Sequence, residues 1–115
     1  MAVVLAGCGA AEPAGDALAG ERLFNTRLEG IPLEDACSSC HKLTVDTEWA
    51  PTLQGISDRA ADRVDGMSAA EYLRESIVSP GAYQVEGWGN SMPGQYSTVL
   101  TEEDIDNLVA FLLTQ

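Results

Sequence analysis

The stretch Cys37-Ser38-Ser39-Cys40-His41 decides the fold of this 115-residue chain. Two cysteines three positions apart on one turn can reach the two vinyl groups along one edge of a porphyrin, and the adjacent histidine then directs its imidazole at the iron. Cys-x-x-Cys-His is the attachment signature of c-type haem. The motif therefore predicts one covalently bound haem c, attached at Cys37 and Cys40, with His41 as an axial iron ligand.

Three other interpretations of the motif compete with haem. A redox dithiol also carries Cys-x-x-Cys, but it is expected between a strand and a helix, and no strand is predicted here. A zinc site requires four ligands, and the chain has a single histidine and only three cysteines, one of them near its start. A structural disulfide would leave His41 without a role.

A methionine opposite the histidine is a common second ligand in electron carriers. Of the three methionines, Met1 belongs to the N-terminal tail, and Met67 is expected to pack as a hydrophobic staple at the start of a helix. Met92 lies in a long loop, where Pro93 stiffens the chain beside it. Met92 is therefore the candidate second axial ligand, and the alternative is a loop methionine that packs on the core.

Composition and charge narrow the possible functions. The chain carries 18 acidic and six basic residues, a formal net charge of −12, and 45% of its residues are hydrophobic. This hydrophobic content argues against general disorder, and the lack of a basic stripe argues against a nucleic-acid partner. The acidity either favours encounter with a basic protein surface or serves solubility alone. No acid–base or nucleophile constellation is visible, so we predict an electron carrier without bond-making activity.

The N-terminus is typical of the end of an export signal. Residues 1–7 are apolar but far too few to span a membrane, which takes about 20 residues. Leu5-Ala6-Gly7-Cys8 resembles the cleavage box of bacterial lipoproteins, whose cysteine is acylated. The basic start of a signal is missing, which points to a translation start upstream. We expect lipidation at Cys8, a flexible tether over residues 8–15 and a folded domain over residues 16–115, and the alternative is a frayed tail with an incidental cysteine.

Helical periodicity predicts an all-α fold. The first helix should start at the N-cap Asp16 and run to about Arg27, with Gly20 placed where another helix approaches closely. A capping box at residues 68–71 should begin a second helix that ends near Val78.

The last helix should begin at residues 101–104, where acidic side chains meet the positive end of the helix dipole. Residues 49–55 are predicted to be loop, and residues 57–64 either a short helix or a turn. Residues 81–96, which are rich in glycine, are predicted to form a long loop of the kind that is usually functional or disordered. Four aromatic residues are candidates to line the haem pocket or to bind a haem propionate, with ordinary packing as the alternative: Trp49, Tyr83, Trp88 and Tyr96.

The chain resembles the monohaem cytochrome c family in its short bacterial form. The glycine and aromatic residue of residues 20–24, together with Phe111, look like the family's paired terminal helices. The likeness covers residues 16–115 and implies the cytochrome c fold, with three to four helices around one covalent haem c and the first and last helices crossing.

Two shorter segments resemble the family at the predicted haem site. Residues 50–55 resemble the loop that follows the haem-binding motif, which implies that the carbonyl of Pro51 accepts a hydrogen bond from His41 and orients the ring. Met92-Pro93 matches the family's axial methionine motif.

Residues 76–87 are similar to a narrower set of cytochrome c domains. These domains are attached to respiratory complexes, including fusions to haem–copper oxidase subunits and the lipoprotein cytochrome subunits of the quinol-oxidising alternative complex III. Mitochondrial-type carriers are strongly basic, whereas this chain is strongly acidic, so their docking surface is not transferred to it.

The resemblance implies an extracytoplasmic carrier of single electrons in a membrane respiratory or photosynthetic chain. We expect it in the periplasm or at the outer face of the cytoplasmic membrane, lipid-anchored, as a mobile carrier or a fixed subunit. Its partners should be redox proteins or a membrane complex with a basic docking surface. The alternative function is a haem-based sensor in which a small ligand displaces Met92.

Overall fold

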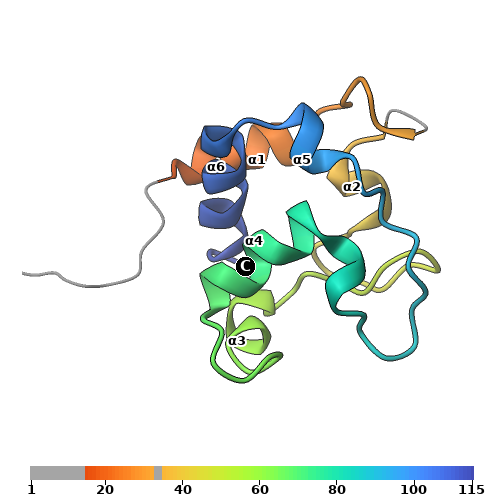
Figure 1. Cartoon of the computed structure of the whole chain (residues 1–115), viewed down its shortest axis with the longest axis vertical. Helices are drawn as coiled ribbons and strands as arrows, with labels where there is room; N and C mark the ends of the chain where they lie inside the picture. The colour runs from red at the N-terminus through yellow and green to blue at the C-terminus, as the bar shows by residue number, and fades with distance from the viewer. Residues whose placement is uncertain (1–14, 33–34) are drawn as a thin grey trace, which may run out of the picture.

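The computed structural model describes residues 15–32 and 35–115, and this part of the chain is all-helical, as predicted (Figure 1). The three longest helices are α1 (Ala17–Phe24), α4 (Ala69–Val78) and α6 (Glu102–Leu112). Three short helices, α2 (Cys37–Cys40), α3 (Ile56–Ala60) and α5 (Tyr96–Val99), and a 3₁₀ turn, η3 (Pro80–Ala82), interrupt the loops between them. None of the described helices combines the length and apolar character that a membrane span requires. The predicted signal segment, Cys8 and the tether up to residue 14 lie outside the described residues.

Helices α1 and α6 cross at one end of the molecule, as the sequence predicts (Figure 1). A Cβ atom added to Gly20 would lie 1.9 Å from the carbonyl oxygen of Asn107, so only glycine permits this approach. The rings of Phe24 and Phe111 pack beside the crossing, with centroids 5.3 Å apart. The backbone N–H of Asp16 donates to Asn107 Oδ1 at 2.8 Å, which adds a polar contact to the apolar one.

Helix α1 ends at Phe24, about three residues earlier than predicted. The side chains of Asn25 and Thr26 donate hydrogen bonds to the carbonyl oxygens of Glu21 and Arg22. These side chains satisfy the last backbone acceptors of the helix, so the chain can leave the helical path without leaving those carbonyls unpaired.

Helices α4 and α6 start at the predicted residues because each begins with a capping box. Ser68 Oγ accepts from the N–H of Glu71, whose carboxylate accepts in turn from the N–H of Ser68. Thr101 and Asp104 form the same reciprocal pair at the start of α6. Each box satisfies two backbone donors that the first helical turn leaves without partners.

Arg74 joins α4 to α6 through its guanidinium group. It donates to the carboxylate of Glu102 and, at 3.2 Å, to Asp106 Oδ1. These are partly exposed ion pairs, which contribute little stability compared with the apolar core beneath them. That core draws on every helix except the short α2: Phe24, Ile56, Ala60, Tyr72, Leu73, Ile77, Tyr96, Ile105, Leu108, Val109, Phe111 and Leu112.

The glycine-rich stretch over residues 81–96 is largely loop, as predicted, with helix only at its two ends. The 3₁₀ turn η3 reaches Ala82, and α5 begins at Tyr96. Residues 57–64, left undecided by their sequence, contain most of α3 followed by turns. The loops of residues 41–55 and 83–95 lie together on the side of the molecule opposite α1 and α6 (Figure 1).

Candidate functional site

A large apolar pocket lies between the helices and these two loops. Its internal space, including the mouth that opens to solvent, is ≈ 1110 Å³. Its walls include His41, Met92, Tyr72 of α4 and Leu108 of α6. In the described part of the chain, no polar or charged residue is fully buried.

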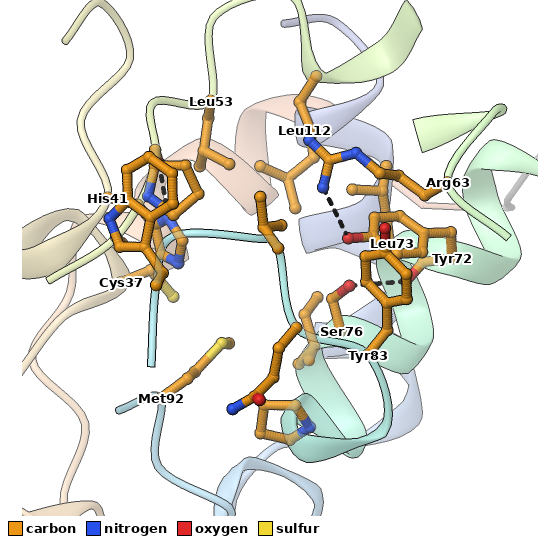
Figure 2. A pocket seen from close by; sticks show the side chains of 18 of the residues that line it. Cys37, His41, Leu53, Arg63, Tyr72, Leu73, Ser76, Tyr83, Met92 and Leu112 are labelled. Atoms are coloured by element: carbon orange, nitrogen blue, oxygen red, sulfur yellow. Dashed lines mark hydrogen bonds between the residues drawn. The ribbon is translucent and has the colours of Figure 1, made fainter. Parts of the chain in front are cut away.

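The four residues predicted to hold haem border this pocket or a smaller cavity beside it. Cys37, His41 and Met92 line both spaces, and Cys40 lines the smaller one. Figure 2 shows the Met92 side chain reaching into the space that Cys37 and His41 border from another side. The fold thereby brings Met92 to the same site as the Cys-x-x-Cys-His segment, although at least 51 positions of sequence separate them.

Helix α2 sets the geometry of the attachment motif. Cys37 and Cys40 are its first and last residues, so their side chains are separated by about one helical turn. His41 caps the helix, and its N–H donates to the carbonyl of Cys37 at 3.0 Å. The backbone of His41 is extended (φ −95°, ψ 118°), which takes its side chain off the helical path and into the pocket wall.

The imidazole of His41 is arranged to act as a neutral metal ligand. Its Nδ1 lies 3.4 Å from the carbonyl oxygen of Pro51, a long hydrogen bond in which the ring nitrogen donates, because a carbonyl can only accept. Burial lowers the pKa of His41, and the bond to Pro51 opposes that shift in part. The neutral ring with Nδ1 protonated leaves the lone pair of Nε2 available to a metal.

The two thiols do not have the properties of a redox dithiol. Cys37 and Cys40 are both free of disulfide bonds. Burial raises the pKa of Cys37 to about 11, and burial, together with the negative charge of Asp35, raises the pKa of Cys40. Catalytic and redox thiols have lowered pKa values that supply thiolate at neutral pH. The environment therefore argues against the dithiol alternative.

Two of the four candidate aromatic residues are tyrosines with packing roles. Tyr96 is 4% exposed, belongs to the hydrophobic core and lines both cavities. Tyr83 packs edge-on against Tyr72 of α4, with ring centroids 5.7 Å apart, and lines the main pocket.

The two tryptophans lie on the loops at the pocket mouth. Trp88 donates its indole N–H to the carbonyl of Thr47 at 3.3 Å, so this polar group is already engaged within the protein. Trp49 lines both cavities and yet remains 57% exposed. Trp88 therefore ties one loop to the other, and Trp49 forms part of the rim.

Two arginines on the pocket wall were not anticipated from the sequence. Arg59 of α3 donates to the carbonyl oxygens of Gln54 and, at 2.9 Å, Thr52. Arg63 donates to the hydroxyl of Tyr72 at 3.1 Å, and a dashed line between these two labelled residues marks the bond in Figure 2. No ion pair with an acidic side chain is found for either within residues 15–32 and 35–115. Their spacing of four residues, in a chain with only six basic residues, is the signal that could have identified them.

Thr47 organises the loop that follows the attachment motif. Its hydroxyl donates to the carbonyl of Cys40 at 2.9 Å and accepts from the N–H groups of Trp49 and Ala50, each at 3.1 Å. Its own N–H donates to the carbonyl of Ala50 at 3.0 Å. One side chain therefore holds the Trp49 rim in a defined position relative to the attachment cysteine.

Thr47→Val is expected to destabilise the protein by about 2 kcal/mol, because it keeps the shape of the side chain but leaves these backbone groups without their partner. Chemical denaturation of the wild type and the variant measures the difference. Thr47→Ser, which retains the hydroxyl, is the control and should recover most of the loss. Equal stability of Thr47→Val and the wild type would contradict the assigned role.

The donor set and the pocket fit a covalently attached haem. Two protonated thiols sit one turn apart, a neutral imidazole follows them, and a thioether enters from a distant loop, all around a largely apolar space. In the described ranges, no three His, Cys, Asp or Glu side chains gather as a metal site of their own.

Comparison with known proteins agrees with this fit. The model of one protein family, described as Cytochrome c, matches residues 17–115, nearly the whole of the chain. No curated protein matches the chain.

Proposed function

Because the chain belongs to the cytochrome c family, we propose that it relays single electrons outside the cytoplasm in a membrane respiratory or photosynthetic chain, with His41 and Met92 as axial ligands. Its family identifies it as an electron carrier with one covalent haem c rather than as an enzyme. The bound haem supplies a reversible one-electron couple at its iron. The observation that carries the proposal is the convergence of Cys37, His41 and Met92 on one apolar pocket.

The protein's own residues would hold and tune the group. Cys37 and Cys40 would fix it covalently at α2, and Pro51 would hold the His41 ring in one orientation through Nδ1. Met92 opposite the histidine favours a higher reduction potential than a second histidine would. The apolar walls act in the same direction, because a buried site disfavours the extra positive charge of the oxidised state.

Arg59 and Arg63 would receive the two carboxylates that every haem carries. They are cations on the wall of an apolar pocket, and they donate hydrogen bonds to neutral carbonyl and hydroxyl groups. Guanidinium groups bind carboxylates in a planar, charge-assisted geometry. This arrangement would orient the group in the pocket and would place positive charge beside it.

Arg63→Gln is therefore expected to lower the reduction potential by roughly tens of millivolts, because it removes a positive charge that disfavours the oxidised state. Spectroelectrochemical titration of the holoprotein measures the change. Arg22→Gln, which removes an equal charge from the exposed surface of α1, is the matched control. Equal shifts in the two variants would contradict a local role for Arg63.

Electron transfer as such is tested by a redox titration of the mature holoprotein. We expect a reversible one-electron transition and a ferrous spectrum that does not change under carbon monoxide, because Met92 keeps the iron position closed. An irreversible or absent transition would refute the carrier function. Formation of a carbon monoxide adduct would favour the sensor function, in which Met92 is displaced.

The lipid anchor is proposed from the sequence around Cys8 alone, and intact-mass analysis of membrane-extracted protein tests it. Acylated Cys8 as the first residue is the expected result, and an unmodified N-terminus at Met1 would refute it. Extraction in mild detergent distinguishes a fixed subunit of a complex from a mobile carrier. Co-purification with a respiratory complex would identify a fixed subunit, and elution as a lone lipoprotein would identify a mobile carrier.

A further inference from the structure

The loop after the attachment motif presents two large apolar side chains to solvent. Val45 is 56% and Trp49 is 57% exposed, and they lie only four residues apart. Single exposed apolar residues are ordinary on protein surfaces, but an exposed tryptophan is costly in water and is characteristic of interaction sites. Together with the exposed acids Asp46, Glu48 and Glu86, these two residues define what we call the Trp49 surface.

The Trp49 surface is held in place by the structure. Thr47 fixes the backbone of Trp49, and Asp46 Oδ1 accepts from the N–H of Thr52 at 2.8 Å. The bond from Trp88 to the carbonyl of Thr47 brings the neighbouring loop, which carries Glu86, against this one. A surface organised before binding loses little conformational entropy when a partner docks.

The same surface borders the haem pocket. Trp49 lines both cavities while more than half of its area faces solvent. The hydroxyl of Thr47 contacts the carbonyl of Cys40, which places the loop directly against the attachment motif. A protein docked on Trp49 would therefore stand beside the pocket, separated from it by a single side chain.

The charges of the surface define the class of partner. Glu48 and Glu86 are exposed, and neither takes part in an ion pair in the described part of the chain. Residues 45–49 contain no basic residue, and the nearest along the chain, Lys42, directs its ammonium group to the carbonyl of Ser38 at 2.8 Å. An apolar centre with an acidic rim is complementary to an apolar patch with a basic rim.

We propose that the Trp49 surface is the docking site for a redox protein with a lysine- or arginine-rich face. This inference rests on the proposed electron-transfer function and adds to it the location of the contact. The bound haem would supply one electron from its reduced state, and the oxidised centre of the partner would accept it. No proton moves, and no bond forms or breaks.

The test compares two lysine substitutions at exposed apolar positions. Val45→Lys adds a positive charge to the Trp49 surface, and Leu18→Lys adds the same charge on α1, where Leu18 is 66% exposed. Stopped-flow kinetics measures the oxidation of each reduced holoprotein by two acceptors, a strongly basic mitochondrial-type cytochrome c and the anion ferricyanide. Potentials are measured in parallel, so that changes in driving force are separated from changes in docking.

Val45→Lys is expected to slow oxidation by the basic acceptor about tenfold at low salt and to accelerate oxidation by ferricyanide, while Leu18→Lys changes both rates much less. Glu48→Gln should also slow oxidation by the basic acceptor and accelerate oxidation by ferricyanide, but by smaller factors. Glu21→Gln on α1 is its control. Equal effects of Val45→Lys and Leu18→Lys would overturn the proposal, because net charge alone would then explain them. A wild-type protein that neither acceptor oxidises would refute the electron-transfer function itself.

A binding measurement without electron transfer provides the second readout. Reduced basic cytochrome c is added to the reduced protein, and the chemical-shift changes in the NMR spectrum of this protein are measured. The indole N–H of Trp49 should shift more than the methyl groups of Leu18, and the shift should shrink in Val45→Lys and at high salt. Shifts centred on α1, or spread evenly over the surface, would overturn the assignment.

Discussion

Met92→Ala is expected to lower the reduction potential by roughly 0.1–0.3 V, a fraction of the span of about 0.8 V that axial ligands set in haem proteins. The thioether favours the reduced state, and alanine leaves that coordination position to water or an added ligand. The ferrous variant should therefore bind carbon monoxide. Spectroelectrochemistry and carbon monoxide difference spectra measure the two effects.

Met67→Ala is the matched control for this substitution. Met67 is partly buried and packs against the hydrophobic core, but it lines neither cavity at the site. Its replacement should lower stability and leave the potential and the ligand-binding behaviour unchanged. If Met92→Ala kept the wild-type potential and bound no carbon monoxide, Met92 would not be the axial ligand.

Gly20→Ala is expected to destabilise the protein by about 3 kcal/mol or more, although alanine is the better helix former by about 1 kcal/mol. The added Cβ would lie 1.9 Å from the carbonyl oxygen of Asn107 and 2.9 Å from the Cβ of Phe111. The first of these atoms belongs to the backbone of α6, so relief requires the two helices to separate. Separation would loosen the contact between Phe24 and Phe111.

Thermal and chemical denaturation of the holoprotein measures this loss. Gly94→Ala is the control, because a Cβ at Gly94 meets nothing within 4 Å and its backbone is not in the left-handed region. Its stability should remain within about 0.5 kcal/mol of the wild type. A Gly20→Ala variant as stable as wild type would show that the two helices do not pack as closely as described.

The parts of the fold that could be predicted are those whose signals are local in the sequence. The capping boxes at Ser68 and Thr101 depend on residues three positions apart, and each marked a helix start correctly. The close crossing at Gly20 followed from a glycine in an otherwise favourable helix. Helices α2 and α5, of four residues each, are too short to show a helical period, and their positions could not be read in this way.

The parts of the site that could not be predicted depend on contacts between distant residues. Trp88 is a candidate pocket residue in the sequence, but its bond to Thr47 joins loops 41 residues apart. No pattern in the sequence indicates that Tyr72 lies at the pocket wall, where its hydroxyl accepts a hydrogen bond from Arg63. Neither partner can be chosen before the fold is known, because many hydroxyl and carbonyl groups are equally available in the sequence.

The proposed carrier function depends on one haem that Cys37 and Cys40 would hold and whose iron His41 and Met92 would bind. An optical spectrum of the matured protein, recorded oxidised and then reduced, with acid extraction of the same sample, tests it most directly. We expect a haem that stays with the chain after extraction and a sulfur-to-iron charge-transfer band in the oxidised spectrum. Covalent haem without that band would contradict ligation by Met92. No covalent haem in protein made with a working maturation system would refute attachment at Cys37 and Cys40 and, with it, the proposed electron-transfer function.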